Sequence, residues 1–254
     1  MRASLFNITG FLLAAFLIAG CKNQKEEFIT ETPSDYYPLQ IGKYLTYRLD
    51  STVFVSLGRK EEVHVYQEKH VIDAQITDNL GRTSYRIFRY LRDSAGLKPW
   101  QSSGTYMITP LQNSVEVVED NLRVIRLFAP IKEGTSWKGN RYLPSDPYTN
   151  EFTFSNDDNM ADWNFTTQSL NETLNLNGKT YTNVITVKSV DEALNVPITD
   201  TKSYASRSLS IDKYAKGIGP VYQELILWEY QPNPGANSPY KVGFGVKRTL
   251  IDHN

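Results

Sequence analysis

The chain has 254 residues, of which 40% are hydrophobic and 22% charged, a balance that excludes a disordered chain and a multi-span membrane protein. Its 27 Lys and Arg residues nearly cancel 28 Asp and Glu residues, so the net charge favours no nucleic-acid partner. Aromatic residues make up 12%, with 16 Tyr and 11 Phe, which favours β-sheets over a helix bundle.

The N-terminal residues 1–20 have the features of a signal peptide. Arg2 supplies a positive start, and a mostly apolar run follows from Leu5 to Ala19. This run is too short and too soon followed by polar residues to be a membrane span. The only cysteine of the chain, Cys21, comes directly after Gly20. The mature chain is therefore expected to contain no disulfide.

The sequence Leu17-Ile18-Ala19-Gly20-Cys21 resembles the lipobox of bacterial lipoproteins. This resemblance implies cleavage after Gly20 and a diacylglycerol on Cys21, whose acyl chains would anchor the protein to a membrane. The alternative is an ordinary secretory signal with a chance cysteine. Residues 21–35 are polar and aperiodic at their start, and they are expected to form a flexible lipidated tether before a single domain at 36–254.

The position of the anchored protein follows from two further features of the tether. Lys22, and not an aspartate, follows the cysteine, which argues against retention in the inner membrane. The segment Lys25-Glu26-Glu27 resembles the export signal of surface-exposed Bacteroidota lipoproteins. We therefore expect the protein at the outer membrane, with the periplasmic and the surface-exposed orientation both open.

Strand patterns dominate the rest of the chain. Residues with high β propensity alternate with polar residues in many short segments, which is typical of strands with one buried face. The expected strands are 44–55, 63–76, 84–92, 105–109, 114–119, 122–128, 174–176, 181–190, 206–214, 220–230 and 241–251.

Turn signals separate these segments. Asn177-Gly178 is the strongest hairpin signal of the chain, and Asp120-Asn121 is a second two-residue connection. Helix signals are weak, and the loop-rich stretch 132–159 is expected to be a junction within the domain. About ten to thirteen short strands predict an all-β fold with a curved antiparallel sheet, as a half-barrel or barrel-like structure.

Four short sequence elements together resemble Bacteroidota outer-membrane lipoproteins of unknown function. Each has a mechanical role, because its glycines suit tight turns and its aromatic residues suit a core. The resemblance implies no activity. At the level of fold, it extends distantly to half-barrel lipid carriers of the bacterial envelope. The elements are 36–47 (YYPLQIGKYLTY), 134–137 (GTSW), 177–185 (NGKTYTNVI) and 214–221 (YAKGIGPV).

Residues with metal-binding or catalytic chemistry are few. His64 and His70 share one face of an expected strand but stand roughly 20 Å apart, too far for one metal ion, and two solvent-facing histidines are expected. Asp157, Asp158 and Asp162 form the one acidic loop, a weak calcium candidate that lacks the EF-hand spacing and is expected to be solvated.

Two serines resemble acceptors for a sugar modification. Ser51 and Ser94 each follow an aspartate, as in the O-glycosylation motif of Bacteroidota. Modification requires that both side chains be exposed.

The chain carries no motif for nucleophilic catalysis, phosphate binding or dinucleotide binding, and no cofactor is expected. We expect a non-enzymatic, lipid-anchored envelope protein that binds a hydrophobic or glycan ligand or an envelope protein partner. Three alternatives stay open: a lipid or lipoprotein carrier, an accessory subunit of an envelope uptake or secretion complex, and a hydrolase.

Overall fold

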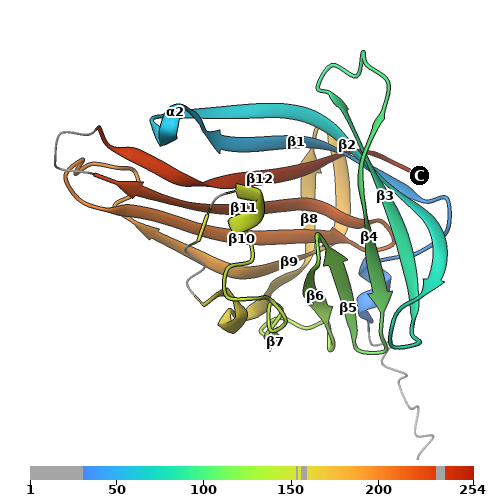
Figure 1. Cartoon of the computed structure of the whole chain (residues 1–254). Coiled ribbons are helices and arrows are strands. Elements are labelled where there is room, and N and C mark those ends of the chain that lie inside the picture. Colours follow the sequence, from blue (N-terminus) through green and yellow to red (C-terminus); the bar gives the residue numbers. More distant parts are fainter. Residues whose placement is uncertain (1–30, 153, 156–158, 233–237) are drawn as a thin grey trace, which may run out of the picture. The chain divides into compact units, whose positions relative to one another are not determined.

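Twelve antiparallel strands form one sheet that curls into a nearly closed barrel (Figure 1). The structure is a computed structural model and describes residues 31–152, 154–155, 159–232 and 238–254. The strands are β1 (Tyr44–Phe54), β2 (Lys60–Thr77), β3 (Thr83–Asp93), β4 (Gln101–Pro110), β5 (Ser114–Glu119), β6 (Leu122–Phe128), β7 (Ser136–Trp137), β8 (Phe165–Leu176), β9 (Lys179–Leu194), β10 (Ala205–Ala215), β11 (Gly219–Gln231) and β12 (Tyr240–His253). The short helical segments are η2 (Pro33–Tyr36), α2 (Val55–Gly58), α3 (Thr149–Phe152) and η3 (Met160–Asp162).

The strand order brings the two ends of the folded chain together in the middle of the sheet. Strands β1 to β6 pair consecutively, as do β7 to β12, and the β1–β12 pair joins the two runs. Strands β6 and β7 follow one another in sequence but lie at opposite edges of the sheet. The expected all-β fold with a curved, barrel-like antiparallel sheet is therefore confirmed.

The two edges of the sheet meet at a seam beside β6. The amide of Ile125 donates a hydrogen bond of 2.8 Å to the carbonyl oxygen of Gly139. The indole N–H of Trp137 donates to the carbonyl oxygen of Ile125, also at 2.8 Å. A Cβ atom at Gly139 would lie 2.5 Å from the ring of Phe165, so the close approach at the seam requires glycine.

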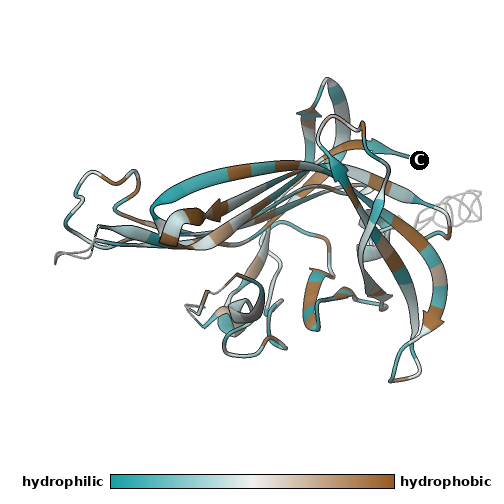
Figure 2. Cartoon of the chain, turned by 45° about the horizontal axis from the view of Figure 1, so that its top comes forward, coloured by the Kyte–Doolittle hydropathy of each residue, from teal (hydrophilic) through white to brown (hydrophobic). Residues whose placement is uncertain are grey.

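Hydrophobic and polar residues alternate along the strands (Figure 2), and many of the hydrophobic ones are buried. The largest side chains that are almost fully buried are aromatic: Tyr36, Tyr47, Tyr214 and Phe244. This alternation is what the sequence pattern predicts, since successive side chains of a strand face opposite sides of the sheet.

Two predicted hairpin turns have the expected backbone. Asp120 and Asn121 have φ angles of 51° and 63°, and Asn177 and Gly178 have φ angles of 49° and 77°. Two successive positive φ angles are typical of the type I′ turn, whose twist matches that of the flanking strands.

The folded unit begins at residue 31, earlier than the end of the expected tether at residue 35. The hydroxyl of Tyr36 donates to Glu31 at 2.6 Å, and the ammonium of Lys216 lies 2.6 Å from the same carboxylate. Pro33 and Tyr36 are buried. Residues 31–35 therefore pack against the barrel beside the β10–β11 turn. No helix within the described ranges is long and apolar enough to cross a membrane.

Candidate functional site

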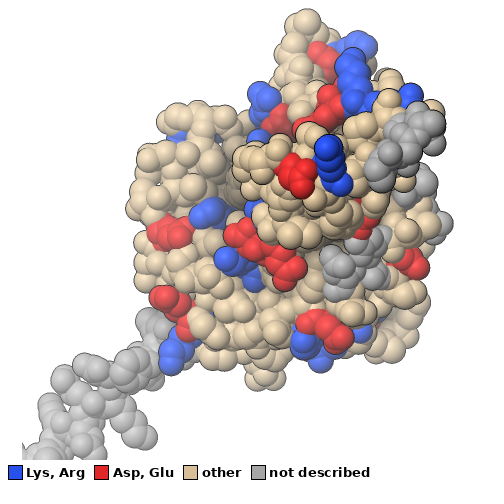
Figure 3. Space-filling model, turned by 90° about the vertical axis from the view of Figure 1, so that its left-hand side faces the viewer, with Lys and Arg blue, Asp and Glu red and all other residues tan. Residues whose placement is uncertain are grey.

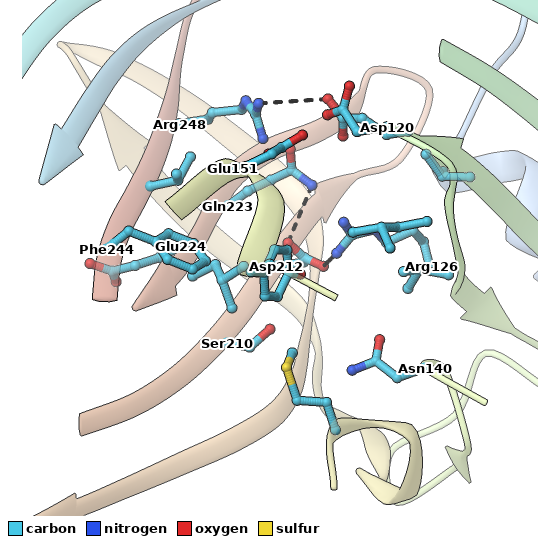
Figure 4. A pocket seen from close by; sticks show the side chains of 18 of the residues that line it. Asp120, Arg126, Asn140, Glu151, Ser210, Asp212, Gln223, Glu224, Phe244 and Arg248 are labelled. Atoms are coloured by element: carbon cyan, nitrogen blue, oxygen red, sulfur yellow. Dashed lines mark hydrogen bonds and ion pairs between the residues drawn. The ribbon is translucent and has the colours of Figure 1, made fainter. Parts of the chain in front are cut away.

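A cavity of about 180 Å³ lies inside the barrel, between strands β5, β6, β10, β11 and β12 and the connection from β7 to β8 (Figure 4). A separate apolar cavity of about 30 Å³ lies beside Tyr37 and Ile72. One water molecule needs roughly 10–15 Å³ of such space, so the first cavity holds roughly a dozen water-sized groups and the second about two. Of the two, the first has room for an organic ligand.

Aromatic packing on Phe244 holds the β7–β8 connection over the barrel interior. The ring of Phe152, in α3, stacks on Phe244 with a centroid distance of 3.8 Å and an interplanar angle of 14°. Tyr148 meets Phe244 edge-on at 5.1 Å. Met160 of η3 is buried, and Trp163 lines the same cavity. These residues form its apolar wall.

One side of the cavity is charged, and its centre is Arg248 of β12. The Nε of Arg248 donates to Glu68 at 2.6 Å, and its Nη2 lies 3.9 Å from Glu119. Burial by itself raises the pKa of Glu68, but Arg248 and His70 outweigh it and hold that pKa well below its usual range. Burial also raises the pKa of Glu119. Arg248 and Arg89 stabilise its charged form more strongly, so the pKa is lowered overall.

A second charged group surrounds Asp212 of β10. Arg126 lies 3.2 Å from Oδ2 of Asp212, and the hydroxyl of Tyr214 donates to the same oxygen at 3.2 Å. Gln223 donates from Nε2 to Oδ1 at 3.3 Å. Burial lowers the pKa of Arg126, but Asp212 outweighs that effect and raises it above its ordinary value. Arg126 therefore stays charged in the barrel.

The rim of the cavity near Asp120 also includes Arg89, which forms an ion pair with Glu119 and lies 3.3 Å from Asp120. Glu151 of α3 lies at the same rim (Figure 4). Burial and the nearby carboxylate of Asp120 raise the pKa of Glu151, while Arg89 partly opposes them. Viewed from the end where α2 lies, acidic and basic side chains are intermixed on the surface (Figure 3).

Two buried polar side chains of the cavity wall are left without a partner by the part of the chain that the structure describes. Asn140 is 4% exposed and Ser210 is 8% exposed, and both line the cavity (Figure 4). Among the described residues, neither side chain forms a hydrogen bond. The polar atoms of both side chains are open to the cavity, so they are available to bind water or a ligand.

The structure corrects the expectation for one histidine. His64 and His70 both lie on β2, six positions apart and with no break in the register with β1 between them. His64 is exposed, but His70 is buried and faces the barrel interior, where its Nδ1 lies 3.0 Å from the Tyr106 hydroxyl. The prediction of two solvent-facing histidines was therefore wrong for His70, because the sheet curls and encloses the inner end of β2.

The remaining predicted site residues do not meet in the cavity. Cys21, Asp157 and Asp158 lie outside the described residues. Asp162 is exposed in η3, and within the described ranges no group of acidic, histidine or cysteine residues could hold a metal ion.

The two serines with the O-glycosylation motif lie in different environments. Ser94 is exposed in the β3–β4 turn. Ser51 is half-buried within β1, opposite Val246 on one side and His64 on the other.

Sequence reasoning missed the residues that form the cavity, although one signal was present. Asp212 occupies the position between Ser210 and Tyr214 in β10, on the buried face of an alternating strand. A charged residue at such a position is expected to have an interior partner. The partner itself, Arg126, lies 86 positions away and has no local signal.

No protein-family model matches the chain, and no curated protein is detectably similar to it.

Proposed function

We propose that this chain is a non-enzymatic, lipid-anchored protein of the outer membrane, and that its barrel binds a small polar ligand in the 180 Å³ cavity. The observation that carries the proposal is the pair of buried side chains, Asn140 and Ser210, that face the cavity without a partner among the described residues. Support for the anchor comes from the lipobox-like sequence that ends in Cys21 and from the resemblance to Bacteroidota lipoproteins.

The composition of the cavity wall favours a polar ligand over an acyl chain. Ion pairs of Arg126, Arg248 and Arg89 line one side of the larger cavity. The apolar cavity beside Ile72 has only about 30 Å³. A lipid carrier needs a large dry apolar space, so these two features argue against carriage of a lipid.

The role of an accessory subunit finds less support than ligand binding. Exposed hydrophobic residues of the described part, such as Leu57, Leu80 and Leu97, lie in three separate turns. Partner surfaces are usually contiguous apolar patches of several hundred Å². Envelope protein partners are therefore the weaker proposal.

A hydrolase is the second candidate, because two carboxylates of the cavity have pKa values displaced in opposite directions. Burial and Asp120 raise the pKa of Glu151, whereas Arg248 and Arg89 lower the pKa of Glu119 against the effect of burial. Such a divergence is typical of acid and base pairs. The carboxylate of Glu119, however, is already engaged by two guanidinium groups, which favours binding over catalysis.

Native mass spectrometry of the mature protein, purified gently from its host envelope, tests the binding function. We expect a stoichiometric small-molecule adduct that organic or aqueous extraction identifies. Ser210→Leu should abolish the adduct, because the larger side chain fills the cavity and removes no protein hydrogen bond. The matched control is Ser94→Leu, the same change on an exposed turn. An adduct that survives Ser210→Leu contradicts the proposal, as does a clean wild-type mass from a protein that also binds none of the small molecules added to it.

The hydrolase alternative is tested separately with chromogenic glycosides and esters. We expect no turnover by the wild-type protein. Turnover that falls in Glu151→Gln would instead favour the enzyme.

A further inference from the structure

The charges that line the cavity disfavour an anionic ligand. The guanidinium groups of Arg89, Arg126 and Arg248 each lie within 4.0 Å of a carboxylate of the cavity wall. Five carboxylates line the cavity, and a sixth, that of Glu68, pairs with Arg248 from behind: the lining five are Glu119, Asp120, Glu151, Asp212 and Glu224. No excess positive charge is therefore left for a phosphate or a carboxylate ligand, and the negative excess repels it.

Three uncharged side chains of the cavity wall keep hydrogen-bonding groups that no described residue engages. The amide of Asn140 both donates and accepts, and so does the hydroxyl of Ser210. Gln223 uses its nitrogen for Asp212, while its side-chain oxygen accepts no hydrogen bond from the described residues. A ligand hydroxyl is also both donor and acceptor, so it can satisfy each of these groups without an unpaired charge.

The apolar wall opposes these polar groups. Trp163 and the stacked rings of Phe152 and Phe244 line the same cavity as Asn140 and Ser210. The faces of aromatic rings carry a negative quadrupole and attract polarised C–H groups. A ring that carries hydroxyls on its edge and C–H bonds on its faces matches both walls. The volume of about 180 Å³ holds roughly a dozen heavy groups, the size of one such ring with its substituents.

We propose that the cavity binds one uncharged sugar ring, either a free monosaccharide or the terminal residue of a glycan. Asn140 and Ser210 hydrogen-bond the hydroxyls, Asp212 and Gln223 accept further hydroxyls, and Trp163 packs against a ring face. This inference rests on the proposed binding function and specifies its ligand class.

Saturation-transfer NMR on the mature protein tests the ligand class. The probes are glucose, galactose, mannose, glucuronate, glucosamine and palmitate, each added alone. We expect saturation of at least one neutral hexose and none of glucuronate or palmitate. Neutral oligosaccharides that end in the bound hexose distinguish the two sources. Tighter binding of an oligosaccharide indicates a glycan terminus, and equal or weaker binding indicates the free sugar.

Two variants connect the signal to the cavity. Asn140→Leu and Ser210→Ala should each weaken binding of that hexose tenfold or more, since neither change removes a hydrogen bond within the described protein. The control is Asn164→Leu, an exposed neighbour of Trp163 that does not line the cavity. Unchanged affinity in both cavity variants overturns the assignment, as does a response to glucuronate or palmitate alone.

The outcome also separates this inference from the proposed function. A native adduct that is lost in Ser210→Leu but contains no sugar leaves the binding function in place and overturns the ligand class. A protein that carries no adduct and responds to none of the probes overturns both.

Discussion

Replacement of Arg248 by methionine tests whether the buried ion pairs stabilise the barrel. Methionine retains most of the length of the side chain but removes the charge that holds Glu68 and Glu119. The side chain of Arg248 is 17% exposed and that of Glu68 is 5% exposed, so solvent screens the pair little. Removal of one partner from a buried pair costs about 3–5 kcal/mol, because the other charge stays buried and unpaired.

The loss should depend on pH, and its sign follows from the pKa of Glu68. In the wild type this pKa lies below its ordinary value of 4.5, so ionisation of Glu68 stabilises the fold above about pH 4.5 and less as the pH falls. The loss of Arg248 removes the largest effect that opposes burial, so the pKa of Glu68 rises although His70 remains, and ionisation of Glu68 then stabilises the fold less above that pH. The free-energy gap between wild type and variant is therefore largest at pH 7 and shrinks below about pH 4.5.

Urea denaturation at pH 7 and pH 4 measures both effects. The double variant Arg248→Met with Glu68→Gln should recover at least about 1 kcal/mol relative to the single variant at pH 7. Lys179→Met is the matched control, since Lys179 and Asp252 form an exposed pair at 4.0 Å, and it should cost less than about 0.5 kcal/mol. A loss below about 1 kcal/mol for Arg248→Met, or one independent of pH, would refute the reasoning.

Three other predictions concern the seam, the close approach of β12 to β11 at Gly243, and the lipid anchor. Trp137→Phe retains the ring packing but leaves a buried carbonyl oxygen of β6 without its donor. Urea denaturation should show that the free energy of unfolding falls by about 1–2 kcal/mol. An unchanged free energy of unfolding would mean that the seam does not depend on the indole. Gly243→Ala should destabilise by more than about 2 kcal/mol in the same assay, since φ is 116° and the new Cβ would lie 2.1 Å from a β11 carbonyl oxygen. Gly42→Ala, at a φ of 87° with nothing within 4 Å, should lose clearly less. Cys21→Ser should move the protein from the membrane pellet to the soluble envelope fraction, and its retention in the pellet would contradict the lipid anchor.

Local sequence patterns predicted long strands best where the pairing with the neighbouring strand is regular. Strand β11 pairs with β12 without a shift from Tyr222 to Gln231, and the sequence predicted most of it. Strand β8 begins at Phe165, but the sequence indicated only 174–176. Its pairing with β9 shifts at three points, and each shift interrupts the alternation of buried and exposed residues that makes a strand recognisable.

The sequence by itself determined most of the strands, the hairpin turns and the curved antiparallel sheet, because side-chain alternation and the backbone preferences of Asn and Gly act within a few residues. Only the tertiary structure decided which residues meet inside the barrel. Glu68 and Arg248 lie 180 positions apart and come together because β1 pairs with both β2 and β12. Alternation specifies the face of the sheet on which a side chain lies. Its partner across the barrel interior depends on the strand order and on closure of the barrel at the seam. The candidate ligand cavity depends on strand order and closure in the same way.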